Sequence, residues 1–171
     1  MYWNELLARS RAEFSLEPMY ASCVPQRGVF AAGAAWMAYY MRRDPQVIPA
    51  IPFGWYGALK YGLSLLAFTL SAALLFQLHP ALALLSVPVF YVIEIHFLFL
   101  FPMLIDGAEA PLRRCLLQPY RLGLFHTLFT VMPIAFYMLA GLAKLRRPLY
   151  NWHIGCLAIL IWYRDVSGAR R

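Results

Sequence analysis

The chain has 171 residues, of which 62% are hydrophobic, 16% aromatic and only 13% charged. Soluble domains usually carry about 25% charged residues, so the composition indicates a single domain embedded in lipid. The net charge is +7, but the cations stand at the ends of apolar stretches. This placement suits anionic headgroups and control of topology, and we expect no nucleic-acid partner.

The N-terminal part of the chain is predicted to lie at the membrane surface. In residues 1–27 apolar side chains recur at near-helical spacing among charged ones, which favours an amphipathic surface helix. Residues 29–41 are apolar, but as a helix they rise only about 20 Å, less than a hydrocarbon core of roughly 30 Å. For 28–60 we therefore expect a short re-entrant or interfacial helix followed by a proline-rich connector.

The remaining residues, 61–171, are predicted to form a transmembrane bundle. The dipeptide His79-Pro80 is read as a tight turn between the first two spans. Pro88 and Pro102 are expected to kink the second span. The predicted fold is an all-α integral membrane protein, a small bundle of three or four transmembrane helices with an N-terminal surface or re-entrant helix. The predicted spans are 61–78, 81–105, 122–143 and, although it has only 15 residues, 149–163.

The positive charges predict an orientation. If 29–41 does not cross the bilayer and 149–163 does, one side holds 12 Lys and Arg residues and the other side holds 3. If 149–163 also stays on the surface, the counts become 9 and 6. The positive-inside rule prefers the first arrangement, with both termini cytoplasmic. The default location is the plasma (inner) membrane of a prokaryote.

Glu94 is the most unusual residue of the predicted bundle because it lies one residue from the middle of the second span. An ionisable group at that depth costs about 2.5–3.5 kcal/mol on insertion scales, so it should face a protein interior and have a partner. Tyr91 precedes it by one helical turn. Thr69 in the first span and Thr130 in the third lie at similar depth. We expect these four residues to form an intramembrane polar network.

Two histidines lie at comparable depth in the second and third spans. His96 and His126 differ in depth by roughly 5 Å, so they could meet between the helices. One hypothesis is that they only cross-link helices; a second is that they ligate haem or a chlorophyll-type pigment. A third hypothesis makes Glu94 a proton or ion carrier, or the acid–base group of a small membrane enzyme.

Four arginines that follow the second and third spans are predicted to bind lipid headgroups. They are Arg113, Arg114, Arg146 and Arg147.

Function is the least determined property of this sequence. It contains no P-loop, dinucleotide-binding, zinc-protease or serine-hydrolase motif. In the short apolar segment near the N-terminus, Gly28 and Ala32, like Ala31 and Ala35, are small residues four apart. These features favour a non-catalytic accessory or assembly subunit that packs with other subunits in a larger membrane complex. Pigment ligation and Glu94-centred transport or catalysis are the alternatives.

Overall fold

The computed structural model describes residues 2–21, 28–41, 51–143, 147 and 149–168. Within these ranges the regular structure is entirely helical, which confirms the all-α prediction. The helices, in chain order, are α1 (Trp3–Leu16), α2 (Val29–Tyr40), α3 (Phe53–Leu78), the 3₁₀ helix η3 (Pro80–Leu85), α4 (Ser86–His96), α5 (Leu100–Ile105), α6 (Pro111–Leu122), α7 (Leu124–Leu142) and α8 (Tyr150–Gly168).

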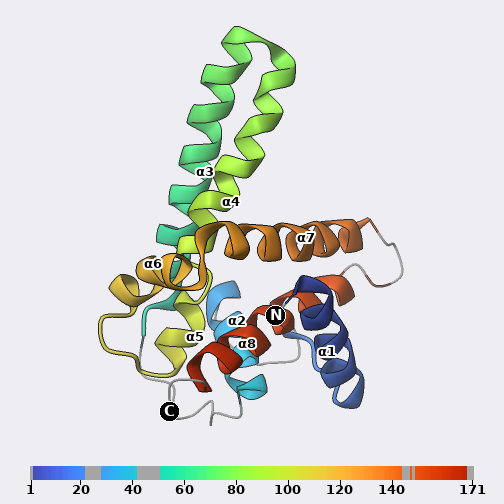
Figure 1. Cartoon of the computed structure of the whole chain (residues 1–171). Helices are drawn as coiled ribbons and strands as arrows, with labels where there is room; N and C mark the ends of the chain where they lie inside the picture. Colours follow the sequence, from blue (N-terminus) through green and yellow to red (C-terminus); the bar gives the residue numbers. More distant parts are fainter. Residues whose placement is uncertain (1, 22–27, 42–50, 144–146, 148, 169–171) are drawn as a thin grey trace.

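A helical hairpin made of α3, η3 and α4 stands out from the rest of the chain (Figure 1). We call residues 53–96 the arm and the remaining helices the body. The arm reverses at His79, whose extended backbone ends α3 and whose Nδ1 accepts a hydrogen bond from the Ala81 N–H at 3.2 Å. Pro80 follows at the first helical position, where its missing N–H costs no hydrogen bond. The predicted tight turn is therefore present.

The second predicted span is interrupted, and its two prolines explain where. Pro102 has no N–H for the Leu98 carbonyl, and its ring crowds that oxygen; α4 accordingly ends at His96 and α5 begins at Leu100. In the same way Pro88 leaves the Leu84 carbonyl without its α-helical donor, and the chain before Ser86 is a 3₁₀ helix. As a result, residues 97–105 lie in the body and only 80–96 belong to the arm.

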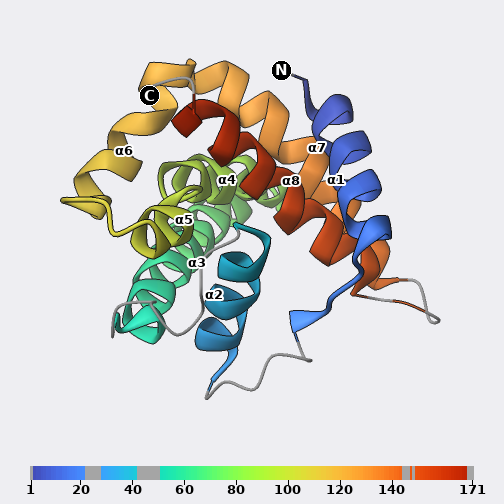
Figure 2. The same cartoon turned by 90° about the horizontal axis from the view of Figure 1, so that it is seen from below.

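The body is built around α8. Ile154, Leu157 and Ala158 are fully buried, and α8 packs against α1, α2 and α7. Seen from below, α8 runs through the middle of the body with α1, α2 and α7 around it (Figure 2). Except for Leu149, the predicted fourth span, 149–163, lies in this helix, which is a core element of the body.

Glycines allow α7 and α8 to approach closely. A Cβ atom on Gly155 would lie 2.2 Å from Met138 Cγ, and one on Gly141 would lie 2.2 Å from Asn151 Cβ. The Asn151 amide nitrogen donates a hydrogen bond of 3.1 Å to the Tyr137 carbonyl. Small residues at a helix contact permit this packing, so one face of α7 is fixed against α8.

The N-terminal helices also use their apolar faces within the body. In α1, Leu6 is fully buried and Phe14 nearly so, and the helix packs on α8. In α2, Ala34, Trp36 and Ala38 are buried. Several of the apolar side chains that predicted a membrane-surface location for 1–27 and 28–41 are therefore buried against other helices of the body.

Three described helical segments are long and apolar enough to cross a membrane: Phe53–Leu78, Pro80–Ile105 and Leu124–Leu142. They correspond to the first three predicted spans, whereas α8 is not among them. The first begins eight residues before the predicted residue 61, so part of the expected proline-rich connector is helical. Its helical residues include Lys60, which becomes important for the candidate site.

Candidate functional site at the foot of the arm

An ion pair joins the two helices of the arm near the body. The Lys60 Nζ atom lies 3.0 Å from Glu94 Oε2, and the two side chains are only 8% and 12% exposed. Ser64 Oγ, also buried, lies 3.3 Å from Glu94 Oε1 and 3.0 Å from the Lys60 carbonyl, and can donate to either. We call Lys60, Ser64 and Glu94 the foot cluster.

The register of the hairpin brings these residues together. Ser64 and Glu94 each lie 15 residues from His79 along the chain, so an antiparallel hairpin places them side by side. Lys60 is one helical turn farther from the tip, on the same face as Ser64. Its long side chain reaches back to the carboxylate, and its ammonium also lies 5.1 Å from the centre of the Tyr61 ring.

The structure thus gives Glu94 partners different from those that the sequence suggested. Thr69 is exposed on the arm, and Thr130 is buried in α7, which packs on α8. Tyr91 lies one turn before Glu94 on α4 and is partly buried. Because α4 ends at His96, Glu94 also lies at the foot of the arm and not at the middle of a straight span.

Chemically, the foot cluster suits a structural role. Removing two charges from water is costly, and their attraction offsets that cost only when the geometry is good and the remaining lone pairs are used. Here a hydroxyl supplies the additional contact. Such a pair fixes the relative position of two helices, because a shift along the arm would separate the charges.

The two histidines proposed as pigment ligands have separate partners. His96 Nδ1 lies 2.6 Å from the Val92 carbonyl and its Nε2 lies 3.1 Å from the Tyr120 hydroxyl, so both ring nitrogens are engaged. His126 is exposed, and its ring meets Trp162 edge-on at 6.3 Å between centroids. Ligation of haem or a chlorophyll-type pigment by this pair stays a prediction.

A third histidine, His153, is enclosed by aromatic rings in the body. The rings of Phe14, Tyr20 and Trp36 lie 5.0–6.1 Å from it. Its Nε2 accepts a hydrogen bond from the Ala21 N–H at 2.9 Å, while Nδ1 lies 2.7 Å from the Leu149 carbonyl. Burial lowers the pKa of His153, because the charged form of the imidazole is disfavoured when it is removed from water. Its position at the start of the predicted fourth span favours an interfacial residue, whereas in the structure His153 is buried.

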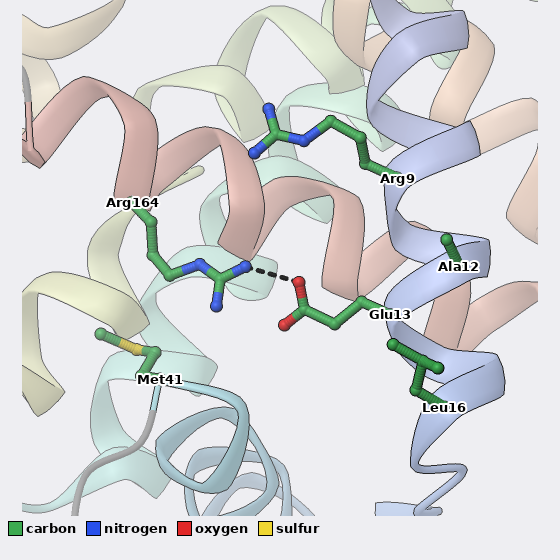
Figure 3. A pocket seen from close by; sticks show the side chains of 6 residues that line it. All are labelled: Arg9, Ala12, Glu13, Leu16, Met41 and Arg164. Carbon is green, nitrogen blue, oxygen red and sulfur yellow. Dashed lines mark hydrogen bonds and ion pairs between the residues drawn. The ribbon is translucent and has the colours of Figure 1, made fainter.

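A hollow of about 630 Å³ lies between α1 and α8 (Figure 3). In it Arg164 pairs with Glu13 at 2.6 Å, and nearby Arg9 pairs with Asp165, also at 2.6 Å. The hydrogen bonds that the Arg9 guanidinium donates to the Asp165 carboxylate raise the pKa of Arg9. Both guanidinium groups are therefore occupied by carboxylates of the same chain, and we interpret the hollow as a clamp between the two helices.

The headgroup arginines are placed in part. Arg113 and Arg114 are exposed on α6, where Arg114 lies 3.7 Å from Glu109. Arg147 is exposed, and Arg146 lies outside the described residues.

The described thiols behave as small apolar groups. Burial raises the pKa of Cys115 to about 11 and that of Cys156 to about 12, so both stay protonated near neutral pH. Within the described part of the chain, no three His, Cys, Asp or Glu side chains gather as metal ligands would.

Comparison of the chain with protein families, with curated proteins and with solved structures finds no match.

Proposed function

We propose that this chain is an accessory or assembly subunit of a membrane complex, which inserts its arm into the bilayer and packs it against helices of a partner membrane protein. The observation that carries the proposal is that most apolar side chains of α3 are not covered by the rest of the protein. Only 6% of the most apolar 18-residue stretch of α3 is buried within the protein. Leu66, Leu70 and Leu74 are 56–65% exposed, which in water would be an aggregation hazard.

The length of the arm supports insertion. Residues 61–78 of α3 rise about 27 Å at 1.5 Å per residue, close to a hydrocarbon core of roughly 30 Å. The foot cluster then lies near the headgroup level on the side of the body. This position lowers the cost of carrying a charged pair, since the penalty for ionisable groups is greatest at the bilayer centre.

The residues on the outer surface of α3 support the proposal that a helix of the partner protein packs there. Gly62, Thr69 and Ala73 lie on the face that points away from α4, and all three are exposed. Their spacing places them along one line of the helix. Within membranes, helix–helix interfaces are enriched in small and hydroxyl side chains, because these allow two helices to approach closely. A surface that contacts only lipid has no need of them, since leucine is as apolar as the lipid tails.

Native electrophoresis in mild detergent, with membranes of the source organism, tests this proposal. We expect the chain to migrate in an assembly with a fixed stoichiometry of a second membrane protein. The double variant Thr69→Leu/Ala73→Leu should accumulate normally but migrate alone. Leu74→Phe adds bulk on the flank of the same helix and serves as the matched control, which should keep the assembly. A wild-type chain that migrates only as a monomer contradicts the proposal.

A further inference from the structure

Helix α7 has two apolar faces, and the body covers only one. Thr127, Ile134 and Gly141 are buried against the body. On the opposite face Phe125, Phe129 and Phe136 are 74%, 67% and 75% exposed. Leu139, 52% exposed, extends the same stripe toward the C-terminal end of the helix. A water-facing helix usually carries polar residues there, so this face requires an apolar neighbour.

The exposed face of α7 points to the side from which the arm rises. Figure 1 shows α7 lying across the foot of the arm with α8 beneath it. In Figure 2, which looks along the arm, α3 and α4 are seen end-on while α7 is seen along its length. Because its inner face is fixed on α8, α7 cannot turn parallel to the arm without leaving the core. When the arm crosses a bilayer, α7 therefore lies along the membrane surface.

The charge distribution points to the same arrangement. All 15 Lys and Arg residues lie at or before Lys60 or at or after Arg113. If only the arm crosses, every one of them is on the side of the body, compared with the 12 and 3 of the four-span arrangement. Complete segregation of cations satisfies the positive-inside rule better. Arg121 precedes α7, and Lys144, Arg146 and Arg147 follow it, so cations stand at both of its ends, where anionic headgroups attract them.

We infer that α7 lies in the plane of the membrane, in the leaflet next to the body, with Phe125, Phe129 and Phe136 against the lipid. Of the three segments long and apolar enough to span, only Phe53–Leu78 and the arm part of the second segment, residues 80–96, cross. The exposed face of α7 contacts the membrane at the boundary between the headgroups and the acyl chains. Helices with an apolar face and basic residues bind to membranes at this depth. This inference rests on the proposed insertion of the arm but is independent of the accessory role.

Cysteine labelling in sealed membrane vesicles of known orientation tests the topology. Single cysteines are placed at Gln77, Arg113 and Arg147 in a chain whose native cysteines are replaced by alanine, and a membrane-impermeant maleimide is added outside. We expect Arg113→Cys and Arg147→Cys to label from the same side, and Gln77→Cys to label from the other. Labelling of Arg147→Cys from the side opposite to Arg113→Cys overturns the placement of α7 alone. If Gln77→Cys labels with Arg113→Cys, the arm does not cross and both proposals fail.

Fluorophore depth is the second readout, because it tests contact with lipid directly. An environment-sensitive probe on Phe129→Cys should be quenched more by lipids brominated near the headgroup than by lipids brominated near the chain ends. The reverse order is expected for Leu70→Cys in the arm, and no quenching for Glu109→Cys, which is almost fully exposed on the body. Emission from Phe129→Cys that matches Glu109→Cys would show a water-facing helix and would overturn the inference.

Discussion

The arm and the body differ in how their helices are covered. Residues 65–78 of α3 contain no buried side chain, whereas ten residues of α8 are buried. The two arm helices are joined by a tight turn at the tip and by the foot cluster near the body. The body is held by side-chain packing, including glycines at the α7–α8 contact. Polar interactions should thus contribute most to stability in the arm, where few side chains are buried. The arm should be sensitive to the loss of charged groups, and the body to changes in side-chain volume.

The largest effect is expected from breaking the foot cluster. Lys60→Met leaves the Glu94 carboxylate buried without its counter-charge, and removal of one partner of a buried pair typically costs about 3–5 kcal/mol. The double variant Lys60→Met/Glu94→Gln removes both charges and should regain most of that loss. Denaturation in detergent micelles followed by circular dichroism measures the difference. Equal stability of the single and double variants would show that the pair does not hold the arm.

A smaller effect is expected from crowding the body. In Gly155→Ala the new Cβ meets Met138 Cγ and Sδ at 2.2 and 2.4 Å, and overpacking of this kind costs about 1–3 kcal/mol. Gly33→Ala is the matched control, since nothing lies within 4 Å of that position in α2. There alanine should be neutral or stabilising, because it favours helix. If both variants unfold alike, the close α7–α8 contact contributes nothing measurable.

Acidification should weaken the body through His153. The folded-state pKa of His153 is lowered by burial, so near and below pH 6.5 the unfolded chain binds a proton more readily than the folded chain. The contribution of the neutral imidazole is thus fully present above that pH and is lost as the pH falls toward the folded-state pKa. Unfolding midpoints at pH 7.5 and 5.5 measure this loss. His153→Phe should reduce the pH dependence, and an unchanged dependence in that variant would assign it to other groups.

The smallest effect is expected at the clamp between α1 and α8. Glu13→Gln removes the charge that pairs with Arg164, and both side chains are about one-third exposed. Solvent screening limits such a pair to about 0.2–1 kcal/mol. The difference from wild type should shrink further at 0.5 M salt, where exposed charges are screened. A loss larger than that of Gly155→Ala would mean that electrostatics, and not packing, dominates the body.

Sequence reasoning found the helices of the arm but not the partner of Glu94. The length of the apolar stretches alone predicts helices at 61–78 and 81–105, because hydropathy identifies membrane-spanning segments well. The residues before 61 contain several prolines and aromatic side chains and were expected to be a connector, although α3 begins at Phe53. This placed Lys60 outside the helix among the headgroup cations. The sequence did contain a signal for the neighbours of Glu94, because Ser64 and Glu94 are equally far along the chain from His79. Using this signal requires treating His79 as the centre of a helical hairpin.

The arrangement of the body was less accessible from sequence. A helix of 15 apolar residues between aromatic side chains fits a short span and a buried core helix equally well. What distinguishes them in α8 is the set of neighbours: α7 across Gly155, and α1 across Phe14 and the ring of His153. These contacts join residues more than a hundred positions apart in the case of α1, and periodicity carries no information on such pairs.

The tip of the arm also bears on the proposed insertion into a membrane. Only a short turn separates α3 from η3, and the polar side chains at that end are Gln77 and His79. A hairpin that carries no lysine or arginine beyond its foot has almost nothing hydrophilic to transfer across the acyl layer. In the proposed insertion, the body can remain on the side where it was synthesised while the two helices enter together, so that no folded domain has to cross the bilayer.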